Sequence, residues 1–513
     1  MTTSVSSAKT SLVVPETPTT ALAEPSLPER PVFRIRHSLA SRFAFLVICV
    51  AIVLSALAYG TVHYWALGLF NLGGLTILVL WVLDAWRLGN MRISRNLLQL
   101  PLLGALVLGL VQLLPLRDAS TVGGLVGVNT LSFDPYSTRL VLVQLATLFI
   151  YFAATLVFVD TPHRLNVLVR TIMIFGFGLA ILGLMQSFTS PTKVYWFRDL
   201  KQSTAFGPFI NRHHFAGYME LTIALPLGLL FAGAVERDKK ILYVFIAGIM
   251  GVALIMTTSR GGIISLVAEI LFLVVVSGIG KKQRRSRRAK PKPNPLKALA
   301  VRAGLAAALM VGLFFAVLLF GGEFSIYRFI DTVNTDNPTS GRAHFWAVTL
   351  DIIRSYPFLG TGLGSFGVVY TQYDTRNGLF RLEQAHNDYL QVLSDGGIIG
   401  AALALAFVVV LFYLAIKRAK SQDSFRRGVA LASLSGCFAV LVHSFFDFTL
   451  HTTANALLFL VLAALATLNG RVENAPKKRH RRSAEPSAVA PGSTSTEDAS
   501  DSIGPGATAL GSV

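Results

Sequence analysis

Hydrophobic residues occur along this chain in long runs separated by short polar segments. Twelve of these runs are about as long as a helix must be, roughly 20 residues, to cross the hydrocarbon core of a bilayer. The pattern therefore predicts an all-α, polytopic membrane protein with about twelve transmembrane helices. We expect these helices at residues 43–59, 65–83, 97–116, 140–159, 165–185, 216–234, 241–256, 263–279, 298–320, 397–416, 429–446 and 454–468.

Composition agrees with this pattern, because 53% of the residues are hydrophobic and only 14% are charged. The first 31 residues are rich in Ser, Thr, Pro and Ala and contain no apolar run, so they do not resemble a signal peptide. We expect disordered cytoplasmic tails at 1–42 and 471–513, on either side of a transmembrane domain at 43–470. Cys49 and Cys437 both fall inside apolar runs, which favours packing roles over a disulfide or a zinc site.

The formal charge of +19 could indicate a nucleic-acid partner, but its distribution indicates membrane topology instead. If the N-terminus is cytoplasmic, roughly two-thirds of the 46 Lys and Arg residues fall in inside segments. The strongest contribution is the run at 281–297, which is typical of a topology anchor on anionic lipid. We therefore expect both termini in the cytoplasm, contact with membrane lipids and no nucleic-acid partner.

The segment 321–396 is by far the longest loop on the outer side, and loops of that length are usually functional. A helix-like stretch begins at Arg342, with Ser340 as a plausible N-cap and Pro357 as a stop. Glycines 360, 362 and 364 follow; no P-loop lysine accompanies them, so they predict a turn that brings backbone close to another group.

A second helix-like stretch of this loop reads RLEQAHNDYLQVLSDGG, and we expect Gly396 and Gly397 to close it. Its apolar residues recur with His386 at helical spacing, which predicts that His386 lies on the buried face. A buried histidine is usually structural. Here it lies where the chain re-enters the membrane, and ionisable groups in such places are functional candidates.

Other polar residues are expected on the same outer side. Arg260 lies in a tight turn between two spans, and Arg212, His213 and His214 lie at the outer end of another. The stretch HSFFDFTLH places His443, Asp447 and His451 four residues apart, which would put them on one helical face. We favour a hydrogen-bonded network over a metal site for this triplet, because no thiolate accompanies it.

Arginines and histidines thus accumulate on the outer face without carboxylates paired at acid/base spacing. The guanidinium group of arginine forms bidentate, charge-assisted hydrogen bonds with phosphate. An anionic, phosphate-bearing lipid substrate follows as a hypothesis. A secondary transporter is the alternative from another class, but no internal repeat or midplane cluster of ionisable groups favours it.

Several of these motifs together resemble those of the O-antigen ligase and polymerase superfamily. They are SRGG from Ser259, the R…W…P..G.G.G.F run from Arg342 to Phe366, and HNDYLQ from His386; NRHHFAGY and HSFFDFTLH resemble one bacterial branch. The resemblance covers roughly residues 65–470.

The resemblance implies a metal-independent glycosyltransferase of the bacterial inner membrane, without a cofactor and with a periplasmic active site. Such enzymes transfer glycan from undecaprenyl diphosphate to an acceptor, which is lipid A core for a ligase or a growing glycan for a polymerase. A protein-glycosylating transferase is a third alternative. By motif position, Arg260 and Arg342 would bind the diphosphate, and His386 would act at the acceptor hydroxyl. Arg212, His214, Asn387, His443 and Asp447 are further candidates for substrate contacts.

One departure from the family pattern concerns the segment that begins at Asn211. Relatives commonly have Asn-Arg-Asn-His-Phe there, whereas this chain has His213 in place of the second asparagine. The role of His213 is left open by the sequence.

Overall fold

The computed structural model describes residues 37–117, 129–200, 205–278, 296, 299–313, 315, 342–376 and 382–473. Most of both expected tails, nearly all of the basic run at 281–297 and the first part of the long loop, with Ser340, lie outside these residues. The described helices belong to one unit of the chain, which ends at Glu473.

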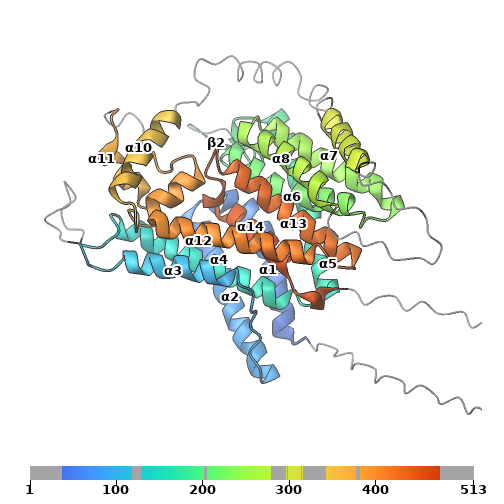
Figure 1. Ribbon diagram of the computed structural model, residues 1–513, viewed down its shortest axis with the longest axis horizontal. Coiled ribbons are helices and arrows are strands. Elements are labelled where there is room, and N and C mark those ends of the chain that lie inside the picture. The colour runs from blue at the N-terminus through green and yellow to red at the C-terminus, as the bar shows by residue number, and fades with distance from the viewer. Residues whose placement is uncertain are drawn as a thin grey trace, which may run out of the picture. The chain divides into compact units, whose positions relative to one another are not determined.

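The described part of the chain is almost entirely helical, as the hydrophobic pattern predicts (Figure 1). Its main helices are α1 (Leu39–Leu57), α2 (Tyr64–Leu88), α3 (Gln99–Gln112), α4 (Pro135–Phe158), α5 (Pro162–Thr189), α6 (Arg212–Ala232), α7 (Lys240–Met256), α8 (Arg260–Val276), a helix at Leu299–Leu313, α10 (Arg342–Ser355), α11 (Phe366–Tyr373), α12 (Asp388–Arg418), α13 (Ser424–His443) and α14 (Thr453–Thr467). Short 3₁₀ turns lie at Tyr59–Thr61, Arg237–Lys239, Thr449–His451 and Gly470–Val472, and a two-stranded antiparallel ribbon pairs β1 (Lys193–Val194) with β2 (Arg198–Asp199).

Every one of the twelve predicted spans overlaps one of these helices. Within the described residues, eight helices are long and apolar enough to cross a membrane, and α3, α14 and the helix at Leu299–Leu313 are apolar but shorter. The prediction of an all-α, polytopic membrane protein is confirmed.

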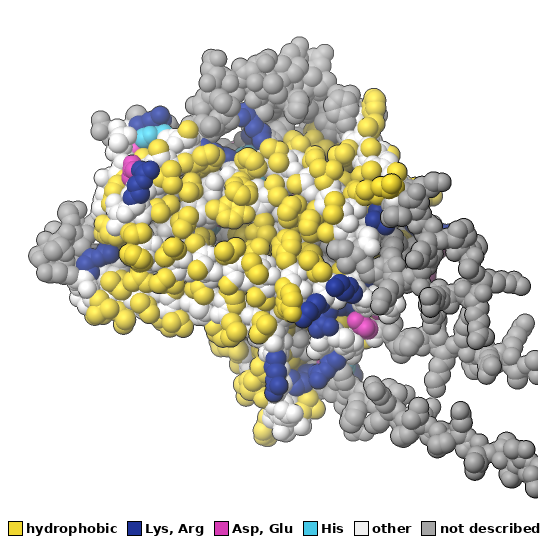
Figure 2. All heavy atoms as spheres, in the orientation of Figure 1, with side chains coloured by type: hydrophobic (Ala, Val, Ile, Leu, Met, Phe, Trp, Pro, Cys, Tyr) yellow, Lys and Arg dark blue, Asp and Glu magenta, His cyan; other side chains and the backbone are white. Residues whose placement is uncertain are grey.

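Burial separates an inner helix from outer ones. The apolar stretch of α6 is 94% buried inside the protein, whereas that of α12 is only 17% buried. Helix α6 approaches α13 closely, since a Cβ atom on Gly228 would lie 2.4 Å from the Cα atom of Ala432. Small residues permit such contact between membrane helices. The outward side chains are mostly hydrophobic, and Figure 2 shows them covering much of the visible face.

The helix ends form two sets, which define two ends of the bundle. At the end that carries α10, called here the α10 end, Gln112 at the C-terminus of α3 donates to the carbonyl oxygens of Leu359 (2.7 Å) and Asp395 (2.8 Å). At the opposite end, Arg92 after α2 pairs with Asp160 after α4 at 2.9 Å. The polar residues singled out from the sequence lie at the α10 end.

The structure corrects the second helix-like stretch of the long loop. Helix α12 begins at Asp388 and continues through Gly396 and Gly397, so these glycines do not close it. Gly397 instead bends the helix with φ 60° and ψ −161°, which frees the amides that follow. Ile398 donates to the carbonyl oxygen of Pro357 at 2.8 Å, which ties the bend to the chain after α10.

The glycine-rich turn after α10 behaves as predicted. Gly360, Gly362 and Gly364 all have positive φ, and a Cβ atom on Gly360 would lie 2.5 Å from the backbone of Asp395. The group that the backbone approaches closely is therefore helix α12 itself. Helix α10 ends at Ser355, two residues before Pro357, as the sequence indicates.

Candidate functional site

Asp447 lies at the centre of the polar residues at the α10 end, in the turn that follows α13, and its side chain is 1% exposed. Its Oδ1 atom lies 3.3 Å from Nδ1 of His386. Its Oδ2 atom lies 3.4 Å from Nη2 of Arg342 and 3.8 Å from Nδ1 of His213. Arg342 also donates to the carbonyl oxygen of Phe446. A single carboxylate therefore joins residues from α6, α10 and the start of α12.

His386 does not lie on a helical face, which corrects the prediction from its spacing. It precedes α12 and has φ 52°, with Asn387 as the N-cap of the helix. Its ring is stacked on Phe345 (centroids 6.3 Å apart) and meets the edge of Phe448 (4.8 Å). The imidazole is nevertheless largely covered, at 26% exposure, because these rings and Asp447 enclose it.

The N-termini of α6 and α8 lie side by side next to Asp447. Arg212, the first residue of α6, donates to the hydroxyl oxygen of Thr258 at 2.6 Å. His213 places Nδ1 2.8 Å from the hydroxyl oxygen of Ser259, which is the N-cap of α8. Arg260 is the first residue of α8. The turn predicted at this position is confirmed, and its residues meet the α6 segment directly.

A second carboxylate, Asp388, organises the other side of the cluster. It accepts a hydrogen bond from the hydroxyl of Ser444 at 2.7 Å and lies 2.9 Å from Nδ1 of His451. The neighbouring Asn387 donates to the carbonyl oxygen of Phe445 at 3.1 Å. The start of α12 is thus fixed to the turn that carries Asp447.

The expectation that His443, Asp447 and His451 share one helical face is wrong. Helix α13 ends at His443, and His451 belongs to a separate 3₁₀ turn. The side chain of His443 instead pairs with Glu220 of α6 at 2.7 Å, with both groups fully buried. The side chains of the three residues contact different partners: His443 pairs with Glu220, Asp447 with His386 and Arg342, and His451 with Asp388.

His214 is buried beside Phe448. It is 8% exposed, and its ring meets the edge of Phe448 at a centroid distance of 4.9 Å. Its Nε2 atom has no hydrogen-bond partner among the described residues. His214 therefore packs beneath the same phenylalanine that borders His386.

Asp447 is held in its charged form. Burial alone would raise the pKa of this carboxyl group, but the hydrogen bond with His386 and the positive charge of Arg342 outweigh that effect and hold the pKa well below its usual range. A depressed carboxyl pKa contributes stability above the pKa of the unfolded chain and loses it as the pH falls. The carboxyl group of Asp447 is therefore ionised at neutral pH. No group of three or more His, Cys, Asp or Glu residues within the described ranges is arranged to hold a metal ion.

The sequence did not single out Asp388, Ser259 or Glu220. Glu220 carried a detectable signal, because a lone acid inside an apolar span is a functional candidate. Ser259 and Asp388 carried a weaker one, since each lies inside a motif that we quoted for other residues. Their contacts join residues up to 223 positions apart, which spacing within one segment does not reveal.

Residues 245–405 match the family model described as O-Antigen ligase. This stretch is similar to the O-antigen ligase family. It includes Arg260, Arg342 and His386, and the resemblance seen in the sequence is confirmed. The match supports an O-antigen ligase-like function in general, and the apolar helices are those of a membrane protein. No curated protein matches the chain. Arg212, His213 and Asp447 fall outside the matched residues, but their contacts place them in the same cluster as the residues inside it.

Proposed function

We propose that this protein transfers glycan from undecaprenyl diphosphate to an acceptor at the periplasmic face of the bacterial inner membrane, as an O-antigen ligase does. The observation that carries the proposal is the His386–Asp447 pair with arginines around it. We propose His386 as the base for the acceptor hydroxyl, and Arg260 and Arg342 as the residues that bind the diphosphate. Lipid A core is the acceptor that a ligase would use.

The pair with Asp447 sets the tautomer of His386. An ionised carboxylate accepts hydrogen bonds only, so Nδ1 of His386 must carry the hydrogen of the 3.3 Å contact. The lone pair is then on Nε2, where the neutral imidazole accepts the proton of the acceptor hydroxyl. That oxygen forms the new bond to the sugar carbon as the bond from that carbon to the phosphate oxygen breaks. General base catalysis of this kind typically contributes about 10²- to 10⁴-fold.

The leaving diphosphate gains negative charge in this step, and fixed positive groups stabilise charge where it develops. Arg212 and Arg260 each begin a helix at the α10 end, where backbone amides also favour anions, and Arg342 lies on α10. Because Arg342 is anchored by Asp447, the carboxylate that orients the base also orients one of the arginines. The arrangement couples the acceptor side of the site to the donor side.

His213 belongs to the donor side in this proposal. We propose that the hydroxyl of Ser259, which is fully buried and accepts from the amide of Gly262 at 3.2 Å, donates to Nδ1 of His213 at 2.8 Å. The hydrogen of the neutral ring is then on Nε2. We propose that His213 donates this hydrogen to the diphosphate without changing its own protonation.

Topology completes the proposal. The positive-inside pattern supports cytoplasmic tails at 1–42 and 471–513, a transmembrane domain at 43–470, and a periplasmic loop at 321–396 that includes α10 and α11. The α10 end of the bundle would then face the periplasm.

A deletion strain complemented with plasmid-borne variants tests this function. The empty strain should accumulate long glycans on undecaprenyl diphosphate, and the wild-type gene should remove them. His386→Ala and Asp447→Asn should fail to do so at equal membrane abundance. Accumulation of single repeat units would instead identify a polymerase, and wild-type behaviour of His386→Ala would overturn the assignment of the base.

A further inference from the structure

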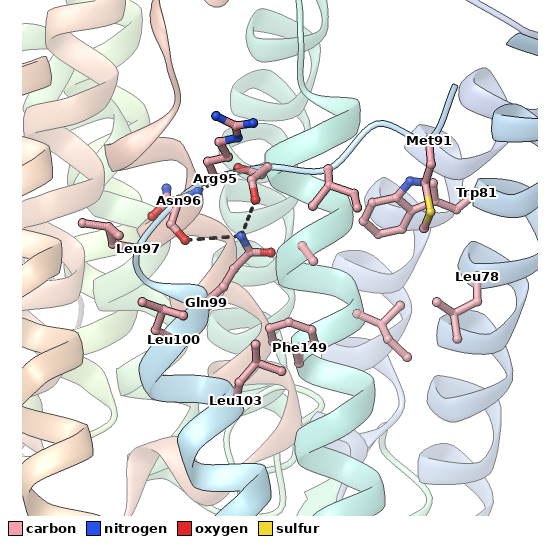
Figure 3. A pocket seen from close by; sticks show the side chains of 14 residues that line it. Leu78, Trp81, Met91, Arg95, Asn96, Leu97, Gln99, Leu100, Leu103 and Phe149 are labelled. Atoms are coloured by element: carbon pink, nitrogen blue, oxygen red, sulfur yellow. Dashed lines mark hydrogen bonds between the residues drawn. The ribbon is translucent and has the colours of Figure 1, made fainter. Parts of the chain in front are cut away.

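A groove with almost wholly apolar walls lies between α2, α3 and α4 at the end of the bundle opposite α10 (Figure 3). Its volume is about 460 Å³. Leu78 and Trp81 of α2, Leu103 of α3 and Phe149 of α4 line it, and the segment Met91–Leu97 borders one end. The groove is remote from Asp447 and takes no part in the proposed reaction.

The segment that borders the groove is fixed in place. The side-chain amide of Gln99 donates to the carbonyl oxygens of Ser94 (2.7 Å) and Asn96 (3.2 Å), as the dashed lines in Figure 3 show. Asn96 donates in turn to the hydroxyl oxygen of Thr467 on α14 at 2.7 Å. The indole of Trp81 donates to the carbonyl oxygen of Arg92 at 3.0 Å. The groove is therefore preformed, and its polar end has a defined position.

The two arginines of this segment differ in their partners. Arg92 is neutralised by Asp84 at 2.7 Å and Asp160 at 2.9 Å. Arg95 is exposed and forms no ion pair with any acidic residue in the described ranges. The polar end of an otherwise apolar groove thus presents one uncompensated positive charge.

Helix α3 also leaves part of the bilayer thickness unfilled. Its 14 residues extend about 21 Å at 1.5 Å per residue. The hydrocarbon core of a bilayer is roughly 30 Å thick. Apolar side chains of α2 and α4, among them Leu78 and Phe149, line the groove beside α3, and a lipid chain is the apolar material that a membrane supplies.

We propose that this groove binds one anionic glycerophospholipid, with an acyl chain along Leu78, Leu103 and Phe149 and the phosphate on Arg95. Two features of the groove identify this occupant. Its walls along α2, α3 and α4 are apolar, and Arg95, the one cationic residue in its lining, lies at one end. Basic pockets between membrane helices bind anionic headgroups in this manner. The site is independent of the transferase proposal.

Native mass spectrometry of the purified, full-length protein tests the proposal, with phosphatidylglycerol and phosphatidylcholine offered at equal concentration. The wild type should retain one phosphatidylglycerol in preference to phosphatidylcholine. Arg95→Gln should reduce that retention about tenfold or more, because charge-assisted hydrogen bonds are lost. Arg87→Gln is the matched control, since Arg87 is exposed in the last turn of α2 but does not line the groove, and it should leave retention unchanged.

A second variant tests the apolar wall. Leu103→Trp should occupy the groove and expel the lipid while the lipid-free protein melts at its usual temperature. Equal losses in the Arg95 and Arg87 variants would overturn the proposal in favour of bulk electrostatics. Retention of undecaprenyl phosphate in preference to phosphatidylglycerol would overturn the assignment to a glycerophospholipid.

Discussion

Among single residues, Asp447 connects the acceptor side of the proposed reaction with the donor side. It contacts His386 through one oxygen, and Arg342 and His213 lie near the other. An uncompensated carboxylate at 1% exposure would be costly, so its neighbours stabilise it as much as it orients them. Loss of any one of these partners should therefore affect the others.

The arginine assignments predict that charge alone will not sustain activity. Lysine keeps the positive charge but lacks the planar fork, so Arg260→Lys and Arg342→Lys should each lower turnover of an undecaprenyl diphosphate-linked donor. The expected loss is about 1.5 to 3 kcal/mol of transition-state stabilisation for each charge-assisted hydrogen bond removed. Turnover by purified variants is the measurement.

A matched control for these variants is Arg354→Lys. Arg354 lies on α10 like Arg342, but it is exposed and its ion pair among the described residues is with Asp351 at 2.7 Å, so its substitution should leave turnover unchanged. Turnover close to that of the wild type in both the Arg260 and Arg342 variants would contradict diphosphate binding and leave these arginines only a role in membrane topology.

If His213 acts through hydrogen bonds and not through proton transfer, a residue with the same donor and acceptor should replace it. Asparagine accepts the Ser259 hydroxyl through Oδ1 and donates through Nδ2, so His213→Asn should keep turnover within a few-fold of the wild type. His213→Leu fills similar space but leaves the hydroxyl without an acceptor, and its turnover should fall more than tenfold. If the asparagine variant fails as severely as the leucine variant, proton transfer by His213 is indicated instead.

The sequence identified most of the residues in this cluster but not how they are joined. Motif resemblance indicated Arg260, Arg342 and His386, and the structure brings the latter two to one carboxylate. Helical spacing failed at His386 and Asp447, because both lie in turns beside helix ends where 3.6-residue periodicity no longer applies. Partners in different helices are set by the packing of the bundle, which local spacing does not encode.

Among the helices, α12 is the one whose bend positions the site. Its first turns contain Asp388 and its later turns form a span, and the two parts meet at Gly397. The bend allows the amides of Ile398 and Ile399 to bond the carbonyl oxygens of Pro357 and Phe358. The chain after α10 is thereby attached to the helix that His386 precedes.

This bend predicts that Gly397→Ala will destabilise the protein. The φ and ψ angles of Gly397 fall in a region almost restricted to glycine, and an added Cβ would lie 2.3 Å from the carbonyl oxygen of Phe358. We expect a loss of about 1 to 3 kcal/mol in unfolding free energy. Thermal unfolding in detergent is the measurement. Gly400→Ala is the control, because its Cβ would meet neighbours no closer than 3.5 Å, and an equal effect of both substitutions would contradict the role of the bend.

The sequence located elements more reliably than their ends. All twelve apolar runs overlap helices, because hydrophobic length is a direct property of a span. The start of α12 was misplaced because two adjacent glycines ordinarily end a helix, whereas here the contact with Phe358 favours a bend that only glycine permits.

The whole described unit carries two candidate sites, one at each end of the bundle. The cluster around Asp447 lies at the α10 end, and the groove with Arg95 lies at the opposite end. Apolar helices such as α4 connect these ends, with Asp134 before the helix at the first end and Asp160 after it at the other. If one end faces the periplasm, the other must face the cytoplasm.

Topology can be tested directly because the native thiols do not interfere. Cys49 and Cys437 are both buried and form no disulfide, so labelling of new cysteines should stand out against a low background. Asp351 is exposed on α10, and Lys420 is exposed just beyond α12 at the opposite end. In intact spheroplasts, Asp351→Cys should react with a membrane-impermeant maleimide, whereas Lys420→Cys should react only after the membrane is permeabilised. This outcome follows from the excess of Lys and Arg in the segments assigned to the cytoplasm. Reversed labelling would place Asp447 and its neighbours on the cytoplasmic side, where they could not act on a donor presented in the periplasm.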